Sequence, residues 1–242
     1  MSLVRCLVLS AASLASPILL DAQDEVLGNL SISANIGFES EYIFRGVKQG
    51  GESLQPSVDA LHPLGSGDLY LGFWASQDLS GSPSDEVDFY AGYTFPLSPI
   101  FAISGGFTYY WFPDDGSIPG SEEEPYFGIF ADLPLRPSLF AYYNIALEQI
   151  LLELSLREDF QVSENSFIEG GVALGIGRAD DSNSDELEGK PSVNFGYGKV
   201  YVDLVYELNQ MSSVSIGVRY SGRQESSYTD YLYWGASVAL GF

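Results

Sequence analysis

Residues 86–95 read EVDFYAGYTF, and in this stretch apolar and polar side chains alternate one by one. The apolar set is Val87, Phe89, Ala91, Tyr93 and Phe95. The other set is Asp88, Tyr90, Gly92 and Thr94. Successive side chains of a β-strand point to opposite faces of the sheet, so this period of two predicts a strand with one apolar face.

The same alternation recurs along the chain and predicts about twelve strands. Each is close to the roughly 9–11 residues that a tilted strand needs to cross a bilayer. Residues 190–198 either extend a strand or belong to a loop. The predicted strands are 31–45, 53–64, 68–77, 86–96, 100–112, 125–133, 138–147, 150–158, 166–176, 199–208, 213–221 and 231–242.

The connections between these strands alternate in length. Short ones are expected at 65–67, 97–99, 134–137 and 209–212, whereas 113–124 and 177–198 are long and acidic. Short turns on one rim and long loops on the other are typical of outer-membrane barrels. The connection at 159–165 is longer than its rim predicts, and the one near 148–149 is shorter.

The composition excludes two classes of protein. Lys and Arg total 10 against 33 Asp and Glu, a formal net charge of −23, so nucleic acid is not an expected partner. Aromatic residues make up 14% of the chain, which argues against the disorder that high acidity alone would suggest.

The N-terminal segment resembles a secretion signal. Arg5 precedes an apolar stretch from Cys6 to Leu20, and Ala22 offers a small residue for cleavage, so residues 1–22 are predicted to be a signal peptide. The alternative, a transmembrane helix, needs roughly 20 apolar residues. The remaining chain, 23–242, is then one barrel domain without cysteine, which excludes thiol catalysis and cysteine metal sites there.

Alternation alone fits either a soluble sandwich or lipocalin-like barrel or a membrane barrel, because only the direction of the apolar face differs. Three features favour an all-β, antiparallel transmembrane β-barrel with both termini in the periplasm. The polar face is rich in Gly, Ser, Tyr and charge. The chain ends at Phe242, and a terminal aromatic on a last strand resembles the signal read by the barrel-assembly machinery. Aromatic residues near strand ends predict two girdles: Tyr42, Phe44 and 109–112 on the loop rim, and Phe95 and Phe101 on the turn rim.

Four short segments in the first half of the chain resemble the TorF-type porin family of Gram-negative bacteria. They are 42–46 (YIFRG) with Gln49, 72–76 (GFWAS), 86–93 (EVDFYAGY) and 109–113 (YYWFP). The resemblance covers about residues 35–113 and implies a β-barrel in the bacterial cell outer membrane. It implies porin activity without a defined substrate, and contact with outer-membrane lipids and lipopolysaccharide.

Alternation also predicts which charged side chains would line a channel. Seven acidic residues against four basic ones would favour cations weakly. In the alternative, these charges pair with one another and plug a barrel whose size lies between filled and open barrels. The predicted lining residues are Glu39, Glu41, Asp59, Asp88, Glu153, Glu169 and Asp203, with Arg45, Arg157, Lys199 and Arg219.

Other chemistry finds little support in the sequence. Arg45 ends the first predicted strand, where it would form a constriction, pair with carboxylates or bind lipopolysaccharide phosphate. The oxygen-rich run 180–185 lacks the spacing of a calcium loop, so no metal and no cofactor are predicted. His62 falls on the lipid face without an evident serine partner, so no enzyme is expected. Residues 171–177 are glycine-rich but precede no helix, so they are not a dinucleotide site.

The sequence therefore predicts passive passage of small hydrophilic solutes or ions across the outer membrane. Two alternatives stay open. One is a non-conducting barrel whose acidic extracellular loops bind a ligand or partner, and the other is a secreted soluble binder.

Overall fold

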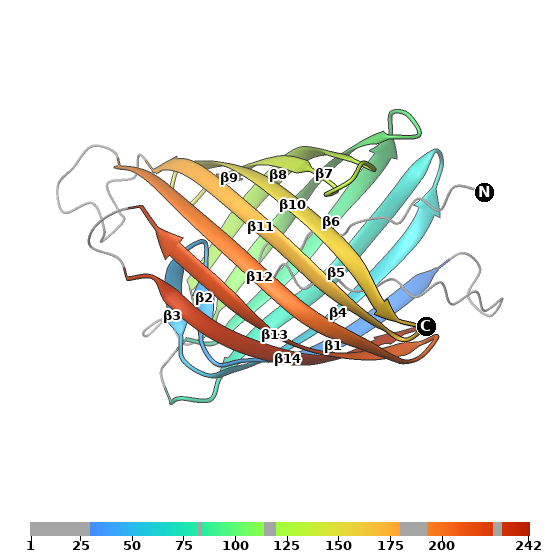
Figure 1. The fold of residues 1–242 in the computed structure, drawn as a ribbon. Helices are drawn as coiled ribbons and strands as arrows, with labels where there is room; N and C mark the ends of the chain where they lie inside the picture. The colour runs from blue at the N-terminus through green and yellow to red at the C-terminus, as the bar shows by residue number, and fades with distance from the viewer. Residues whose placement is uncertain (1–29, 82–83, 114–119, 180–192, 225–228) are drawn as a thin grey trace.

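The computed structural model describes residues 30–242, apart from 82–83, 114–119, 180–192 and 225–228. Twelve antiparallel strands form a closed barrel (Figure 1), which confirms the predicted fold class and strand number. The signal peptide predicted for residues 1–22 lies outside the described residues. The barrel strands are β1 (Ser31–Glu39), β4 (Ser53–Leu64), β5 (Gly67–Asp78), β6 (Glu86–Pro96), β7 (Phe101–Phe112), β8 (Gly120–Ala131), β9 (Ser138–Asn144), β10 (Gln149–Ser163), β11 (Ser166–Ala179), β12 (Val193–Asn209), β13 (Ser212–Arg223) and β14 (Tyr231–Gly241).

The barrel closes where its first strand meets its last. β1 pairs with β4 on one side and with β14 on the other, with Ser33 opposite Gly241. Ile32 and Phe242 also exchange two backbone hydrogen bonds, of 3.1 and 2.7 Å. Closure leaves no unpaired edge in the sheet formed by these twelve strands.

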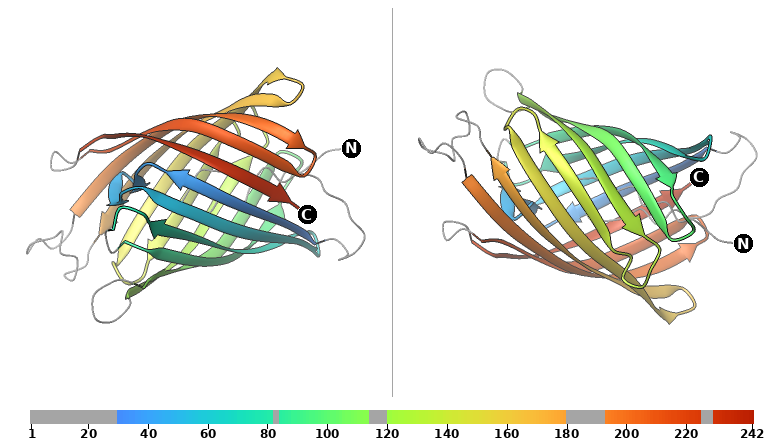
Figure 2. Two further views of the ribbon diagram at one scale, coloured as in Figure 1. Left: turned by 90° about the horizontal axis from the view of Figure 1, so that it is seen from below. Right: turned by 90° about the horizontal axis from the view of Figure 1, so that it is seen from above.

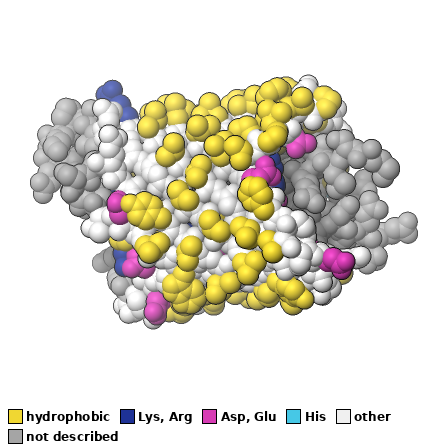
Figure 3. Space-filling view, viewed as in Figure 1, with side chains coloured by type: hydrophobic (Ala, Val, Ile, Leu, Met, Phe, Trp, Pro, Cys, Tyr) yellow, Lys and Arg dark blue, Asp and Glu magenta, His cyan; other side chains and the backbone are white. Residues whose placement is uncertain are grey.

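The two faces of the barrel differ in polarity. Large apolar side chains such as Phe89, Leu174 and Val218 are exposed on the outside, while Asp59 and Glu169 are buried inside. Hydrophobic side chains cover much of the face in Figure 3, and acidic ones lie toward its two ends. This arrangement is the reverse of a soluble barrel and is typical of barrels that face lipid. The described residues contain no helix long and apolar enough to cross a membrane.

The connections at the two ends of the barrel differ in length. The short turns, such as those between β4 and β5 and between β12 and β13, lie at one end. β10 extends to Ser163 and β11 begins at Ser166, so the expected long connection at 159–165 is wrong. β12 begins at Val193, which places most of 190–198 in a strand. The sequence underestimated these strands because their ends continue beyond the clear apolar alternation.

The segment predicted as a single strand, 31–45, forms two separate strands. β1 ends at Glu39, and the chain then turns into the barrel as β2 (Tyr42–Phe44) and β3 (Val47–Gly50), here called the inner hairpin. Figure 2 shows it inside the barrel mouth, at the end opposite the C-terminus. The sequence did not reveal the break because Tyr42 and Phe44 continue the alternation of β1.

Two further sequence predictions are corrected. The acidic stretch 122–124 belongs to β8 and not to a loop, and Glu124 is among the most buried side chains of the described residues. The girdle on the loop rim is also incomplete, because Tyr42 and Tyr110 are buried inside the barrel. Tyr109 and Trp111 do face outward, as do Phe95 and Phe101 on the other rim.

The apolar outer face leads to a test by substitution. Val218→Arg, near the middle of β13, should destabilise the barrel in lipid vesicles by about 2–4 kcal/mol, because a charge there must lose its hydration. Leu64→Arg, at the turn end of β4, is the matched control and should cost about 0–1 kcal/mol. Urea unfolding followed by heat-dependent gel mobility measures both, and equal costs would contradict a lipid-facing band.

Candidate functional site

The inner hairpin turns through two residues with left-handed backbone. Arg45 has φ 47° and Gly46 has φ 79°, the combination of a type I′ turn, which suits the twist of a hairpin. A Cβ on Gly46 would lie 3.0 Å from the carbonyl oxygen of Gly222 and 3.0 Å from Cβ of Tyr197. The tip of the hairpin is therefore packed against β12 and β13.

Arg45 points from this tip toward the opposite wall. Its Nη1 and Nη2 donate to the two carboxylate oxygens of Glu124 at 2.7 and 2.8 Å, and Tyr110 donates to the same carboxylate at 2.9 Å. The guanidinium carbon also lies 4.7 Å from the ring centres of both Phe44 and Tyr142. Bidentate pairing with a carboxylate is a strong interaction for a guanidinium, and the ring contacts add to it, so this pair fixes the hairpin across the mouth.

Other contacts hold the sides of the hairpin. The Tyr42 hydroxyl donates to Glu86 at 2.8 Å, and the Tyr42 ring lies 5.4 Å from that of Trp74. At its base, the backbone N–H of Gly51 donates to Asp78 at 3.1 Å. Lys48 pairs with Glu41 at 3.3 Å, and both are partly exposed.

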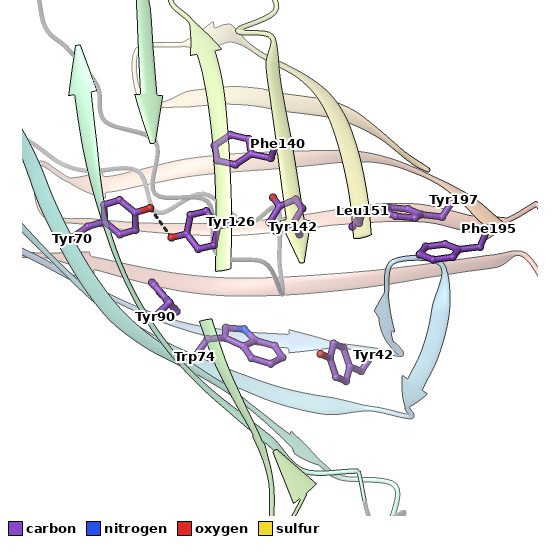
Figure 4. Packing of buried hydrophobic residues seen from close by; sticks show 10 residues of the cluster. All are labelled: Tyr42, Tyr70, Trp74, Tyr90, Tyr126, Phe140, Tyr142, Leu151, Phe195 and Tyr197. Atoms are coloured by element: carbon purple, nitrogen blue, oxygen red, sulfur yellow. Dashed lines mark hydrogen bonds between the residues drawn. The ribbon is translucent and has the colours of Figure 1, made fainter. Parts of the chain in front are cut away.

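Below the hairpin, hydroxyl-bearing aromatic side chains fill the half of the barrel formed by β5 to β9. Tyr70 hydrogen-bonds Tyr126 at 2.6 Å and Ser104 at 2.9 Å, and Figure 4 shows the tyrosine pair beside Phe140 and Tyr142. These rings are nearly inaccessible to solvent. The interior is therefore narrow in this half.

The other half of the interior holds paired charges. Arg219 contacts Glu39 at 3.2 Å and Asp203 at 3.0 Å. Tyr201 donates to Glu169 at 2.9 Å, and Tyr197 donates to Glu153. Arg157, Lys199 and Arg219 share this wall with the carboxylates, so it carries both signs of charge.

The structure places most of the predicted lining residues on the inner face of barrel strands. Asp59, Asp88, Glu169, Asp203 and Arg219 are buried in the interior, and Glu39, Glu153, Arg157 and Lys199 follow the same alternation. Arg45 lies on the inner hairpin and Glu41 in the connection that leads into it, so the two are not on a barrel strand as the alternation predicted. Their role in lining a channel stays a prediction. His62 lies on the outer face of β4.

Sequence reasoning missed three inner carboxylates. Glu86 begins β6 and accepts from Tyr42, while Glu122 and Glu124 were assigned to a loop. The signal available was alternation with Tyr126, since residues 122, 124 and 126 share one face of the strand. Among the described residues, no group of three or more His, Cys, Asp or Glu is arranged to hold a metal ion. The run 180–185 lies outside those residues.

A cavity of about 380 Å³ opens at the mouth beside the hairpin. Phe44 and Arg45 bound it on the hairpin side, and Glu86, Glu122 and Glu124 bound it on the wall side. It is the space through which a solute entering at this end would meet the hairpin.

A protein-family profile described as "Bacterial protein of unknown function (Gcw_chp)" matches residues 23–233. The chain belongs to the Gcw_chp family. No match was found among curated protein sequences. The resemblance to TorF-type porins stays a prediction.

Among the solved structures similar in fold to this Gcw_chp chain are two porins and an outer-membrane channel. An outer membrane channel from Pseudomonas putida F1 has a TM-score of 0.54 and 8% identity, covering 92% of this chain and 98% of that one. The NanC porin has a TM-score of 0.51 and 10% identity, with 88% and 98% covered. The KdgM porin has a TM-score of 0.50 and 12% identity, with 88% and 99% covered. At these identities the likeness concerns the fold.

The effects of substituting Arg45 and Glu124 in this Gcw_chp chain on the free energy of unfolding should be coupled. Arg45→Gln and Glu124→Gln should each destabilise the protein, because each leaves a buried group without its partner. The double variant should lose less free energy of unfolding than the two single variants together, by about 1–3 kcal/mol. Urea unfolding of all four proteins measures the difference, and additive losses would show that the two side chains do not interact.

The crowded position of Gly46 allows a second test. Gly46→Ala should displace the hairpin, because a methyl group there meets Tyr197 of β12 and Gly222 of β13. Gly81→Ala is the matched control: Gly81 also has a positive φ, of 87°, but a methyl group there would have nothing within 4 Å. Hydrogen exchange of the backbone amides in 42–50 should accelerate only in Gly46→Ala. Equal exchange in both variants would contradict the packing of the tip.

Proposed function

We propose that this Gcw_chp protein is a porin-like channel of the bacterial outer membrane, which lets small hydrophilic solutes or ions pass and is constricted by its inner hairpin. The observation that carries the proposal is the closed barrel itself, apolar outside and lined with polar and charged side chains inside. The similarity in fold to small outer-membrane channels over most of the chain supports it.

The proposed setting follows from the outer face. Exposed apolar side chains would contact outer-membrane lipids, and the rim with the acidic connections would meet lipopolysaccharide. The last strand, β14, would be the segment read by the barrel-assembly machinery. The proposal includes no catalytic step, because His62 lies on the outer face of the barrel.

The charge of the interior bears on which solute passes. A KdgM porin of similar fold was solved in complex with disordered oligogalacturonate. We propose a different solute class for this chain, because the carboxylates of β6 and β8 face the path and repel anions. The channel is therefore expected to favour cations weakly.

A second candidate function is a non-conducting barrel whose extracellular loops bind a ligand or partner. The observation that favours it is the filled interior, in which Tyr70, Tyr126 and Tyr142 are buried beneath the hairpin. The same experiment separates the two candidates.

Conductance in planar bilayers tests the proposal. The wild-type protein should show small, discrete current steps, and deletion of residues 42–50 with a short Gly-Ser link should enlarge them, because it removes the constriction. Glu123→Gln, which alters a charge on the opposite face from Glu124, should leave the steps unchanged. A bilayer that stays at its baseline with both the wild-type protein and the deletion variant would contradict the channel and favour the loop-binding candidate.

A further inference from the structure

The six consecutive strands β4 to β9 contain no lysine or arginine. Their inner face nevertheless carries buried carboxylates at Asp59, Asp88 and Glu124 and further ones at Glu86 and Glu122. Arg45 is brought against this wall by the inner hairpin, from outside the wall's own sequence. The positive charge at this wall is thus supplied by a segment separate from it.

The surroundings of Arg45 form a cation-binding cage. One carboxylate receives two parallel N–H bonds, Tyr110 orients that carboxylate, and the rings of Phe44 and Tyr142 lie on the guanidinium. Proteins use the same combination of carboxylate and aromatic faces to bind free guanidinium and ammonium ligands. All of its members except Phe44 belong to the barrel wall, so the cage persists without the hairpin.

Further buried carboxylates lie on the same wall as this cage. The Asp88 side chain is 2% exposed, and its Oδ1 has no hydrogen-bond partner. Glu86 accepts from the neutral hydroxyl group of Tyr42. Buried carboxylates are stable when paired with positive charge, so a cation held at this wall stabilises it.

There is also room for a ligand beside the cage. The cavity of about 380 Å³ at the mouth is bounded by the carboxylates of Glu86, Glu122 and Glu124, with Arg45 and Arg223 as its basic residues. Sites for small molecules usually have volumes of about 300–1,000 Å³. A solute entering from the mouth would therefore reach these carboxylates directly.

We propose that this corner of the mouth binds small organic cations that bear a guanidinium or ammonium group, and that Arg45 occupies the site as a tethered ligand in their absence. A bound solute takes the place of Arg45 on Glu124 and releases the tip of the hairpin. Binding of the cation does not depend on the proposed channel function. Its consequence, the opening of the path, does rest on that function.

Titration calorimetry of the purified protein in detergent tests the binding, with methylguanidinium chloride as the probe. Methylurea is its neutral analogue of similar shape, and sodium chloride at equal concentration is the ionic control. The variants are Arg45→Gln, which removes the tethered cation, and Glu124→Gln, which removes the carboxylate. Glu123→Gln makes the same change of charge on the other face of β8.

Arg45→Gln should bind methylguanidinium at least about tenfold more tightly than the wild type, because the competing occupant is gone. Glu124→Gln should lose the binding, Glu123→Gln should match the wild type, and methylurea should not bind. Equal affinities in the wild type and Arg45→Gln, or binding retained in Glu124→Gln, would overturn the proposal. Heat-dependent gel mobility checks that each variant is folded. If Arg45→Gln does not fold, Arg45→Lys takes its place in the experiment. This variant should bind methylguanidinium more tightly than the wild type, because a lysine cannot pair bidentately with Glu124.

The bilayer arm separates failure of this inference from failure of the proposed function. Millimolar methylguanidinium should raise the wild-type current, and methylurea should not. Discrete currents that respond equally to both compounds would leave the channel standing and overturn the cation site. Binding in calorimetry without any current would support the site and contradict the channel.

Discussion

The ion pair between Arg45 and Glu124 determines how the interior of this barrel is arranged. Arg45 lies at the tip of a nine-residue segment, 42–50, and Glu124 lies on a wall strand 79 positions along the chain. Because both groups are buried, neither is stable inside the barrel without the other. Their pairing sets where the hairpin crosses the mouth and which side chains bound the cavity.

The barrel around this pair has two unlike halves. β4 to β9 present carboxylates and tyrosines without lysine or arginine, while β10 to β14 interleave both charges. An even mixture would make an interior that excludes neither sign. The acidic half, completed by one arginine from the hairpin, instead makes an interior in which a cation has a defined place.

Much of the barrel was predictable from sequence, because alternation of apolar and polar residues follows directly from strand geometry. The run at 86–95 and the strands that repeat it have the predicted faces. The inner hairpin was not predictable, since Tyr42 and Phe44 continue the period of β1 and only the turn at Arg45 and Gly46 changes direction. Glu124 was assigned to a loop because its acidic neighbours concealed the alternation with Tyr126. The ion pair depends on both of these segments, so its two members were each misplaced.

The distance between the hairpin and the wall tests the central claim most directly. Spin labels at Lys48→Cys and Glu123→Cys, in a chain whose single cysteine Cys6 is replaced by serine, report that distance by pulsed electron paramagnetic resonance. A hairpin held by Arg45 and Glu124 should give one short, narrow distribution, which should broaden and lengthen when Arg45→Gln is added. A distribution that is already broad before this change, or one that is unaffected by it, would contradict the account.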